Sequence, residues 1–132
     1  MYSEGYTYNP TSGNLASKAG VSYSYTDTLH AHAVTLLSNG DSFLYDANGN
    51  MRKRTVGGST YNLTHDGENR LVGVTGAVTA NFKYDGDGNR VQGTLGGVTT
   101  TYIGNYYEWS GSGSTQYYYG SGSQRIAMRR SG

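Results

Sequence analysis

Two stretches of the sequence decide the fold: Phe43-Leu44-Tyr45-Asp46-Ala47-Asn48-Gly49-Asn50 and Phe82-Lys83-Tyr84-Asp85-Gly86-Asp87-Gly88-Asn89. Both read aromatic-x-Tyr-Asp-x-x-Gly-Asn, so the sequence contains an internal repeat. The aspartate can accept hydrogen bonds from the backbone amides just ahead of it, and the glycine can take the positive φ that a tight reversal needs. Each stretch therefore predicts a strand that ends in a tight turn.

The residues around these turns have the pattern of β-strands. In residues 78–84, apolar or aromatic side chains alternate with polar ones, which is the two-residue period of a strand. A return strand is predicted at residues 90–95, and Gly96-Gly97 then favours a two-residue hairpin turn before a strand at 98–103. The same order recurs at 51–56, Gly57-Gly58 and 59–65. The sequence thus predicts consecutive antiparallel hairpins.

Less regular copies extend the repeat. Leu63-Thr64-His65-Asp66-Gly67-Glu68-Asn69-Arg70 is interpreted as a third copy, one residue shorter in the turn, with His65 in place of the tyrosine. Residues 6–15 form a fourth copy with Asn9 in place of the aspartate, and a degenerate copy is expected near residues 23–27. The residues assigned to the structural repeat turns are Tyr45, Asp46, Gly49, Asn50, His65, Asp66, Asn69, Tyr84, Asp85, Gly88 and Asn89.

Two regions depart from the repeat. Residues 28–37 are the best helix candidate, but Val34, Thr35 and the following Ser38-Asn39-Gly40-Asp41 suit a strand and a turn better. The region is therefore interpreted as an irregular excursion followed by a strand. The tail has the Gly/Ser composition of a flexible linker at 110–114 and 120–123. Because Tyr117-Tyr118-Tyr119 and residues 125–129 are aromatic or apolar at many positions, a further hairpin is the better interpretation.

Composition excludes several classes. The 132 residues include 21 Gly, 14 Tyr and no Cys, and the formal net charge is +1. Without cysteine there is no disulfide framework or thiolate metal site. The balanced charge gives no strong field for nucleic acid, and no apolar run reaches the roughly 18 residues of a membrane-spanning helix. Tyrosines supply the area that can be buried in this aliphatic-poor chain.

The motifs Tyr45-Asp46-Ala47-Asn48-Gly49-Asn50, His65-Asp66-Gly67-Glu68-Asn69-Arg70-Leu71 and Tyr84-Asp85-Gly86-Asp87-Gly88-Asn89-Arg90-Val91 resemble YD repeats, the units of bacterial Rhs proteins and of the teneurin shell. Residues 100–109 and the tail to Met128-Arg129 resemble the later part of such an array. The resemblance implies an all-β fold in which hairpins form a spiral, solenoid-like twisted sheet. We expect one domain over residues 1–132, with degenerate repeats at 1–42, clear repeats at 43–103 and Tyr/Gly/Ser-rich terminal hairpins at 104–132.

The resemblance also implies a location outside the cell or at its surface, and a structural function in a shell. Shells of this kind enclose a toxic segment or other cargo in large members, but 132 residues are too few to close one and no toxin domain is visible. Unpaired strand edges bind compatible strands. We therefore expect a homo-oligomer or polymer formed edge to edge, which can be an open filament.

An aromatic cluster is the main candidate contact site. It comprises Tyr106, Tyr107, Trp109, Tyr117, Tyr118 and Tyr119. Strand alternation predicts Tyr117 and Tyr119 on one face and Tyr118 on the other. Exposed, these rings can contact a glycan or a protein partner; buried, they form the core, which is the favoured interpretation.

Other chemistry is weaker. Asp85-x-Asp87-x-Asn89 resembles the start of a calcium loop, but Arg90 stands at the glycine position and Gly96 at the glutamate position, so an aspartate-capped turn is favoured. His30 and His32 on a strand would share one face as half of a zinc site. No third or fourth ligand is evident, so ordinary polar or core histidines are the favoured interpretation. We assign no catalytic, cofactor or metal residue and expect no enzyme activity. The function predicted is that of a non-enzymatic structural repeat protein; the alternative is a carbohydrate-binding or adhesive surface module.

Overall fold

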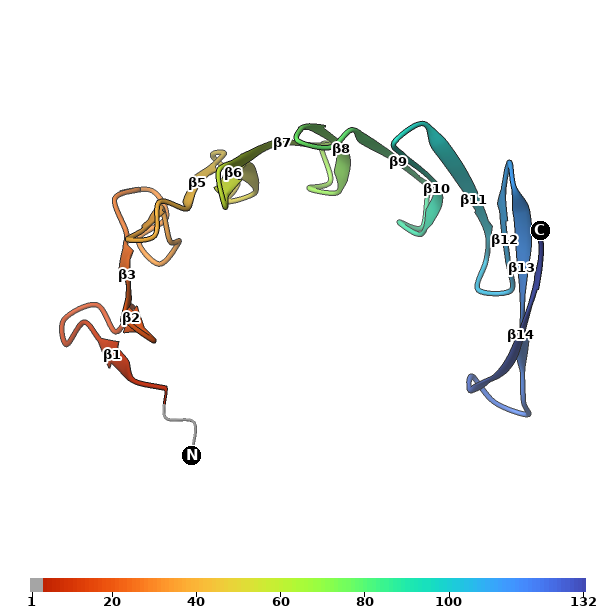
Figure 1. Cartoon of the computed structure of the whole chain (residues 1–132), viewed down its shortest axis with the longest axis horizontal. Helices are drawn as coiled ribbons and strands as arrows, with labels where there is room; N and C mark the ends of the chain where they lie inside the picture. Colours follow the sequence, from red (N-terminus) through yellow and green to blue (C-terminus); the bar gives the residue numbers. More distant parts are fainter. Residues whose placement is uncertain (1–3) are drawn as a thin grey trace. The chain divides into compact units, whose positions relative to one another are not determined.

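A computed structural model describes residues 4–132 of the chain and confirms the all-β prediction. These residues form fourteen antiparallel strands that follow one another in a single unclosed sheet, in the order of the chain (Figure 1). Over the described range there is no helix, and hence none with the length and apolar character needed to cross a bilayer.

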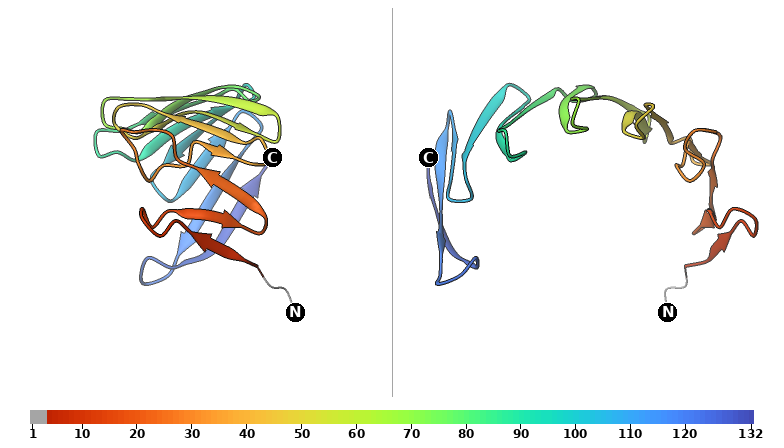
Figure 2. Two further views of the ribbon diagram at one scale, coloured as in Figure 1. Left: turned by 90° about the vertical axis from the view of Figure 1, so that its left-hand side faces the viewer. Right: turned by 180° about the vertical axis from the view of Figure 1, so that it is seen from behind.

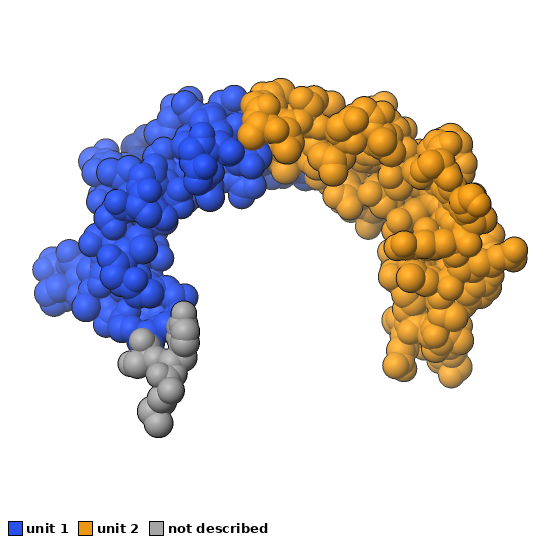
Figure 3. Space-filling model, in the orientation of Figure 1, with its two compact units in different colours: residues 1–70 blue, residues 71–132 orange. Residues whose placement is uncertain are grey.

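The chain forms two compact units, coloured separately in Figure 3. The described part of the first unit, residues 4–70, contains β1 (Tyr6–Tyr8), β2 (Leu15–Lys18), β3 (Val21–Ser24), β4 (Leu36–Leu37), β5 (Ser42–Tyr45), β6 (Met51–Val56) and β7 (Ser59–His65). The second unit, residues 71–132, contains β8 (Leu71–Gly76), β9 (Ala80–Tyr84), β10 (Arg90–Leu95), β11 (Val98–Ile103), β12 (Tyr107–Ser110), β13 (Gly113–Tyr119) and β14 (Arg125–Ser131). Figure 2 shows the reversals that join neighbouring strands in each unit; most are short, and the segment between β3 and β4 is longer.

The predicted strands agree closely with those observed. The bounds of β6, β7, β10 and β11 are those expected from the pattern, and the tail forms the hairpin β13–β14. The residues before β4 form an irregular excursion, as expected. At Gly57-Gly58 and Gly96-Gly97 both glycines have positive φ, between 55° and 84°, which matches the right-handed twist of a two-residue hairpin.

A β-bulge recurs at the tyrosine position, and the sequence pattern did not reveal it. The register shifts by one residue at Tyr8, Tyr45 and Tyr84, so that two residues on the return strand face one on the outgoing strand. Tyr119 has the same shift. Because a bulge increases local twist, each of these hairpins is twisted at the same place relative to its turn.

The sheet has a thin core. Among residues 4–132, Ala80 in β9 is the one apolar side chain classed as buried, at 3% exposed. Many of the aromatic and aliphatic side chains on the strands are half-buried, because a single layer of strands leaves both faces accessible. Side-chain contacts along each face therefore take the place of a central core.

Arginines cover aromatic rings in each of the two units. The Arg54 guanidinium carbon lies 4.9 Å from the centre of the Tyr61 ring, in the register that pairs these two residues. Arg90 lies 4.9 Å from the Tyr102 ring and 5.5 Å from Phe82. Such cation–π contacts each contribute about 0.5–1 kcal/mol at exposed sites, while the aliphatic stem shields the ring from water.

Candidate functional site

The repeat aspartates are bound into their turns. Asp85 Oδ1 accepts hydrogen bonds from the backbone amides of Asp87 and Asn89, at 3.0 and 2.8 Å, and Oδ2 accepts one from the Asn89 side chain at 3.2 Å. Asp46 accepts the equivalent bonds from Asn48 and Asn50. These bonds confirm an aspartate-capped turn at the stretch that resembles a calcium loop.

This geometry sets the ionisation of the turn carboxylates. The backbone amide of Asn89, its side chain and the other turn amides lower the pKa of Asp85. The backbone amide of Arg70, despite an opposing effect of burial, likewise lowers the pKa of Asp66. Both carboxylates are therefore held in the charged form, which is the form that accepts the turn amides.

The third turn is not shorter, so that part of the sequence interpretation is wrong. Asp66 Oδ1 accepts the amides of Glu68 and Arg70, which are two and four residues ahead, as in the other turns. Asn69 therefore stands at the glycine position, and its φ is +61°. Asparagine tolerates this conformation better than most residues, so it can take the place of the turn glycine. The sequence interpretation instead matches Asn69 to the asparagine that follows the glycine in the other copies, which makes the turn look one residue shorter.

The repeat tyrosines link neighbouring hairpins through their hydroxyls. Tyr45 donates to the Val34 carbonyl at 2.8 Å, and Tyr84 donates to the Leu71 carbonyl at 2.8 Å. Tyr25, in the degenerate copy, donates to the Leu15 carbonyl at 2.9 Å. Each hydroxyl reaches a backbone carbonyl 10 to 13 residues earlier in the chain. Each repeat tyrosine thus stabilises the structure in two ways: its ring covers apolar area, and its hydroxyl donates a hydrogen bond to the backbone.

Tyr119 belongs to this series, although sequence reasoning placed it in the aromatic cluster. Its hydroxyl donates to the Asn105 carbonyl at 2.8 Å, and the amide of Gly120 donates to the Gln124 carbonyl as Asp85 does to Asn89. The sequence contains a signal for this copy, because Arg90 follows Tyr84 by six residues and Arg125 follows Tyr119 by six residues. Gly120 conceals the copy because it replaces the turn aspartate.

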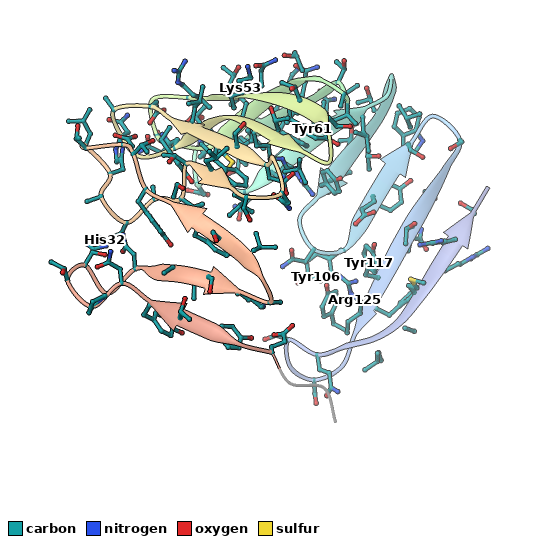
Figure 4. The ribbon with its side chains drawn as sticks, turned by 60° about the vertical axis from the view of Figure 1, so that its left-hand side comes forward. His32, Lys53, Tyr61, Tyr106, Tyr117 and Arg125 are labelled. Atoms are coloured by element: carbon teal, nitrogen blue, oxygen red, sulfur yellow. The ribbon has the colours of Figure 1, made fainter. Side chains whose placement is uncertain are left out.

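One face of the C-terminal hairpins gathers Tyr117, Tyr119 and Arg125. The Arg125 guanidinium lies 3.8 Å from the Tyr117 ring centre and 5.9 Å from that of Tyr119. The Tyr106 ring packs against Tyr119 edge to face, with centres 5.3 Å apart. Figure 4 labels Tyr106, Tyr117 and Arg125 on these hairpins. Tyr117 donates to Glu108 Oε1 at 2.9 Å, and this hydrogen bond is the main cause of a raised Tyr117 pKa. These rings are engaged with one another and with the backbone.

The opposite face carries the other aromatic residues. Trp109 pairs with Ser114, which lies on the same face of β13 as Tyr118, and Tyr107 pairs with Gln116. Trp109 is 51% exposed and Tyr118 46% exposed. Trp109 also lines a shallow cavity of about 380 Å³ with Val98, Thr99 and Ser112. The six aromatic residues therefore do not form one surface: alternation divides them between the two faces, as predicted for residues 117–119.

His30 and His32 lie in the irregular segment and not on a strand, so the condition under which they would share a strand face is not met. His30 Nδ1 bonds to Asp27 Oδ2 at 2.9 Å, whereas His32 Nδ1 bonds to Asn14 Oδ1 at 2.6 Å. The two rings thus have different partners. Within residues 4–132, no three His, Asp or Glu side chains are grouped so that they could hold a metal ion.

The last strand presents a different kind of surface. Among the strands of residues 4–132, β14 pairs with β13 alone, and all seven of its residues are exposed. Its sequence, Arg125-Ile126-Ala127-Met128-Arg129-Arg130-Ser131, combines three cations with two large apolar side chains. One long edge of this strand therefore has backbone N–H and C=O groups without a neighbouring strand in the described structure.

Comparison with known proteins does not assign the chain to a family. No family model matches the chain, and a search of curated proteins finds no match either. The resemblance to YD repeats therefore stays a prediction.

Proposed function

We propose that this chain is a non-enzymatic structural module: a stretch of Rhs-type hairpin sheet, acting outside the cell, that is extended by strand pairing at its edges. It would serve as a segment of a larger shell or as a self-assembling element. The observation that carries the proposal is the β14 edge, seven exposed residues paired on one side only. Edge strands of this length associate with further strands unless something blocks them.

The use of the repeat residues supports a structural role. The turn aspartates bind the amides of their own turns, and Tyr45, Tyr84 and Tyr119 bind the backbone of an earlier segment. Polar groups that recur because every hairpin needs them are poor candidates for a unique active site. The repeat therefore accounts for most of the polar side chains that could suggest chemistry.

Self-assembly can be tested by multi-angle light scattering and electron microscopy over a range of concentrations. We expect species larger than a monomer, and fewer of them in Met128→Lys, which adds a charge to the edge. The matched control is Leu95→Lys, because Leu95 in β10 is as exposed as Met128, at 62% against 56%, but lies inside the sheet. A stable monomer at every concentration would contradict self-assembly.

A second candidate function is a carbohydrate-binding or adhesive module. The observation in its favour is the half-exposed pair Trp109 and Tyr118 on one face, with the shallow cavity beside Trp109. Aromatic side chains that present a wide ring to solvent are frequent anchors in recognition. Binding to a glycan array that disappears in Trp109→Ala but persists in Leu44→Ala, an exposed apolar residue of β5, would favour this function over the first.

A further inference from the structure

The arginines at the end of β14 point to both faces of the sheet. In the β13–β14 register, Arg130 is opposite Thr115 and Arg129 is opposite Gln116. Thr115 lies on the face of Glu108 and Tyr117, whereas Gln116 lies on the face of Tyr118. A strand added beside β14 would therefore meet a guanidinium on each of its two faces at consecutive residues.

Neither Arg129 nor Arg130 forms an ion pair with another residue in the described range 4–132. The ion pairs of residues 4–132 involve Lys18, His30 and Arg70, and β14 contains no acidic residue. Arg125 differs from the other two because it is stacked on Tyr117. Arg129 and Arg130 are exposed, as are the apolar side chains of Met128 and Ile126, at 56% and 66%.

We propose that β14 binds an acidic extended segment by strand addition, with two consecutive carboxylate side chains beside Arg129 and Arg130 and an apolar side chain beside Met128. Backbone hydrogen bonds along the edge supply binding that any strand can use, and the side chains select among strands. Opposite charges on adjacent strands stabilise the pairing, and like charges oppose it. The proposal rests on the free edge invoked for the structural function and adds the chemistry of the partner.

Charge also argues against a second β14 as the occupant. Pairing two copies of this strand would bring together six arginines, three from each chain, with no acidic residue between them. Repulsion of this kind acts as protection against edge-to-edge pairing of identical strands. An acidic partner converts the same arginines from a barrier into a source of specificity.

The test uses a fluorescent nine-residue peptide of alternating Thr and Val with two consecutive central Glu residues, and the same peptide with Gln in place of Glu. Fluorescence anisotropy is measured with the full chain at a concentration where light scattering finds it monomeric. We expect the Glu peptide to bind about three- to tenfold more tightly than the Gln peptide at low salt, and the difference to shrink as salt is raised.

Variants assign the effect to the two arginines. Arg129→Gln with Arg130→Gln should remove the preference for the Glu peptide, while Arg54→Gln, an exposed arginine of β6, should leave it intact. Equal affinity for both peptides, binding of neither, or a preference that survives the double variant would overturn the proposal. Such a result beside normal self-assembly would reject the acidic partner alone, whereas a monomer that prefers the Glu peptide would reject only self-assembly.

Discussion

At the scale of single residues, the turn is the unit of this structure, and residues at three positions form it. An aspartate accepts the amides of the turn, a residue with positive φ closes it, and a tyrosine hydroxyl ties the hairpin to an earlier segment. Asn69 contributes both a backbone conformation and side-chain hydrogen bonds to its turn. It has positive φ, and its Oδ1 accepts hydrogen bonds from the Asn48 and Asn50 side chains at 3.2 and 2.7 Å.

Substitution at Asn69 can separate backbone conformation from side-chain bonding. Asn69→Gly keeps the left-handed conformation and removes the amide bridge, whereas Asn69→Ala loses both. Because a side chain with Cβ costs about 1–2 kcal/mol in this region, we expect the Ala variant to be less stable than the Gly variant by about that amount. Urea unfolding measures the difference, and equal stability of the two variants would show that φ at this position carries no cost.

The tyrosine hydroxyl gives a second prediction. Tyr45→Phe removes the bond to the Val34 carbonyl and leaves that carbonyl half-buried without its partner. We expect a loss of about 1 kcal/mol in the free energy of unfolding. Tyr118→Phe is the control, because its hydroxyl bonds only to the exposed side chain of Gln116 and should cost little. A loss of equal size in both variants would argue against a special role for the repeat hydroxyl.

The turn carboxylates predict a dependence on acid. The pKa of Asp85 is lowered in the folded chain, so the unfolded chain takes up the proton first as pH falls. The stabilisation is complete well above the unfolded pKa of about 3.9 and is lost as pH falls through the lower, folded pKa. We expect the drop in stability between pH 7 and pH 3, measured by urea unfolding, to be smaller in Asp85→Asn than in Asp87→Asn. Asp87→Asn is the control because it changes a carboxylate in the same turn, and Asp87 bonds to Asp85 through its backbone amide and not through its side chain. Equal drops in the two variants would contradict the assignment of the acid dependence to Asp85.

At the scale of elements, the pairing of β13 with β14 depends on a glycine. A Cβ added to Gly113 would overlap the Ser131 carbonyl oxygen, which belongs to the backbone and not to a flexible side chain. Ser131 is the last residue of β14 and pairs with Ser114. Glycine at position 113 therefore allows the two backbones to approach closely, and a larger residue could be accommodated only by moving the backbone of β14.

Gly113→Ala should detach the end of β14 from β13. We expect a destabilisation of about 1–3 kcal/mol, the usual cost of overpacking, with faster hydrogen exchange along residues 125–131. Gly111→Ala is the matched control, because its added Cβ would meet nothing within 4 Å. Unchanged exchange in the Gly113 variant would mean that the strand end adjusts without cost.

At the scale of the whole molecule, one layer of strands leaves much surface in water. The accessible area is 9180 Å², whereas a compact protein of this mass exposes about 6,800 Å². Folding therefore removes less area from water, by about a sixth, than in a compact domain of the same length. Stability must come from local contacts repeated along the sheet, not from a central core.

This difference predicts a shallow response to denaturant. The slope of unfolding free energy against urea scales with the area exposed on unfolding. We expect a slope about a sixth below that of compact domains of 132 residues, and a heat-capacity change reduced in the same sense, since both follow exposed area. Calorimetry and urea titration together make the measurement; values at or above the compact norm would contradict a single-layer sheet.

The local part of this structure could be predicted because it is written in short stretches. Turn aspartates, paired glycines and alternating strands act within ten residues of one another, so strands such as β6, β7, β10 and β11 were placed from the sequence alone. The bulge at Tyr45 and Tyr84 and the hydroxyl bonds to earlier hairpins were not predicted, because their partners lie on other strands. Asn69 and Gly120 were misread because each replaces the residue type by which a turn is found.

The sequence by itself determined that this chain is a series of antiparallel hairpins with aromatic strands. The tertiary structure alone decided which side chains share a face across neighbouring strands: it placed Tyr107 and Trp109 on the face of Tyr118, gave His30 and His32 different partners and placed exposed arginines along the edge of β14. The physical reason is that turn chemistry is a property of neighbouring residues, whereas a face and an edge exist only when the register of paired strands is fixed.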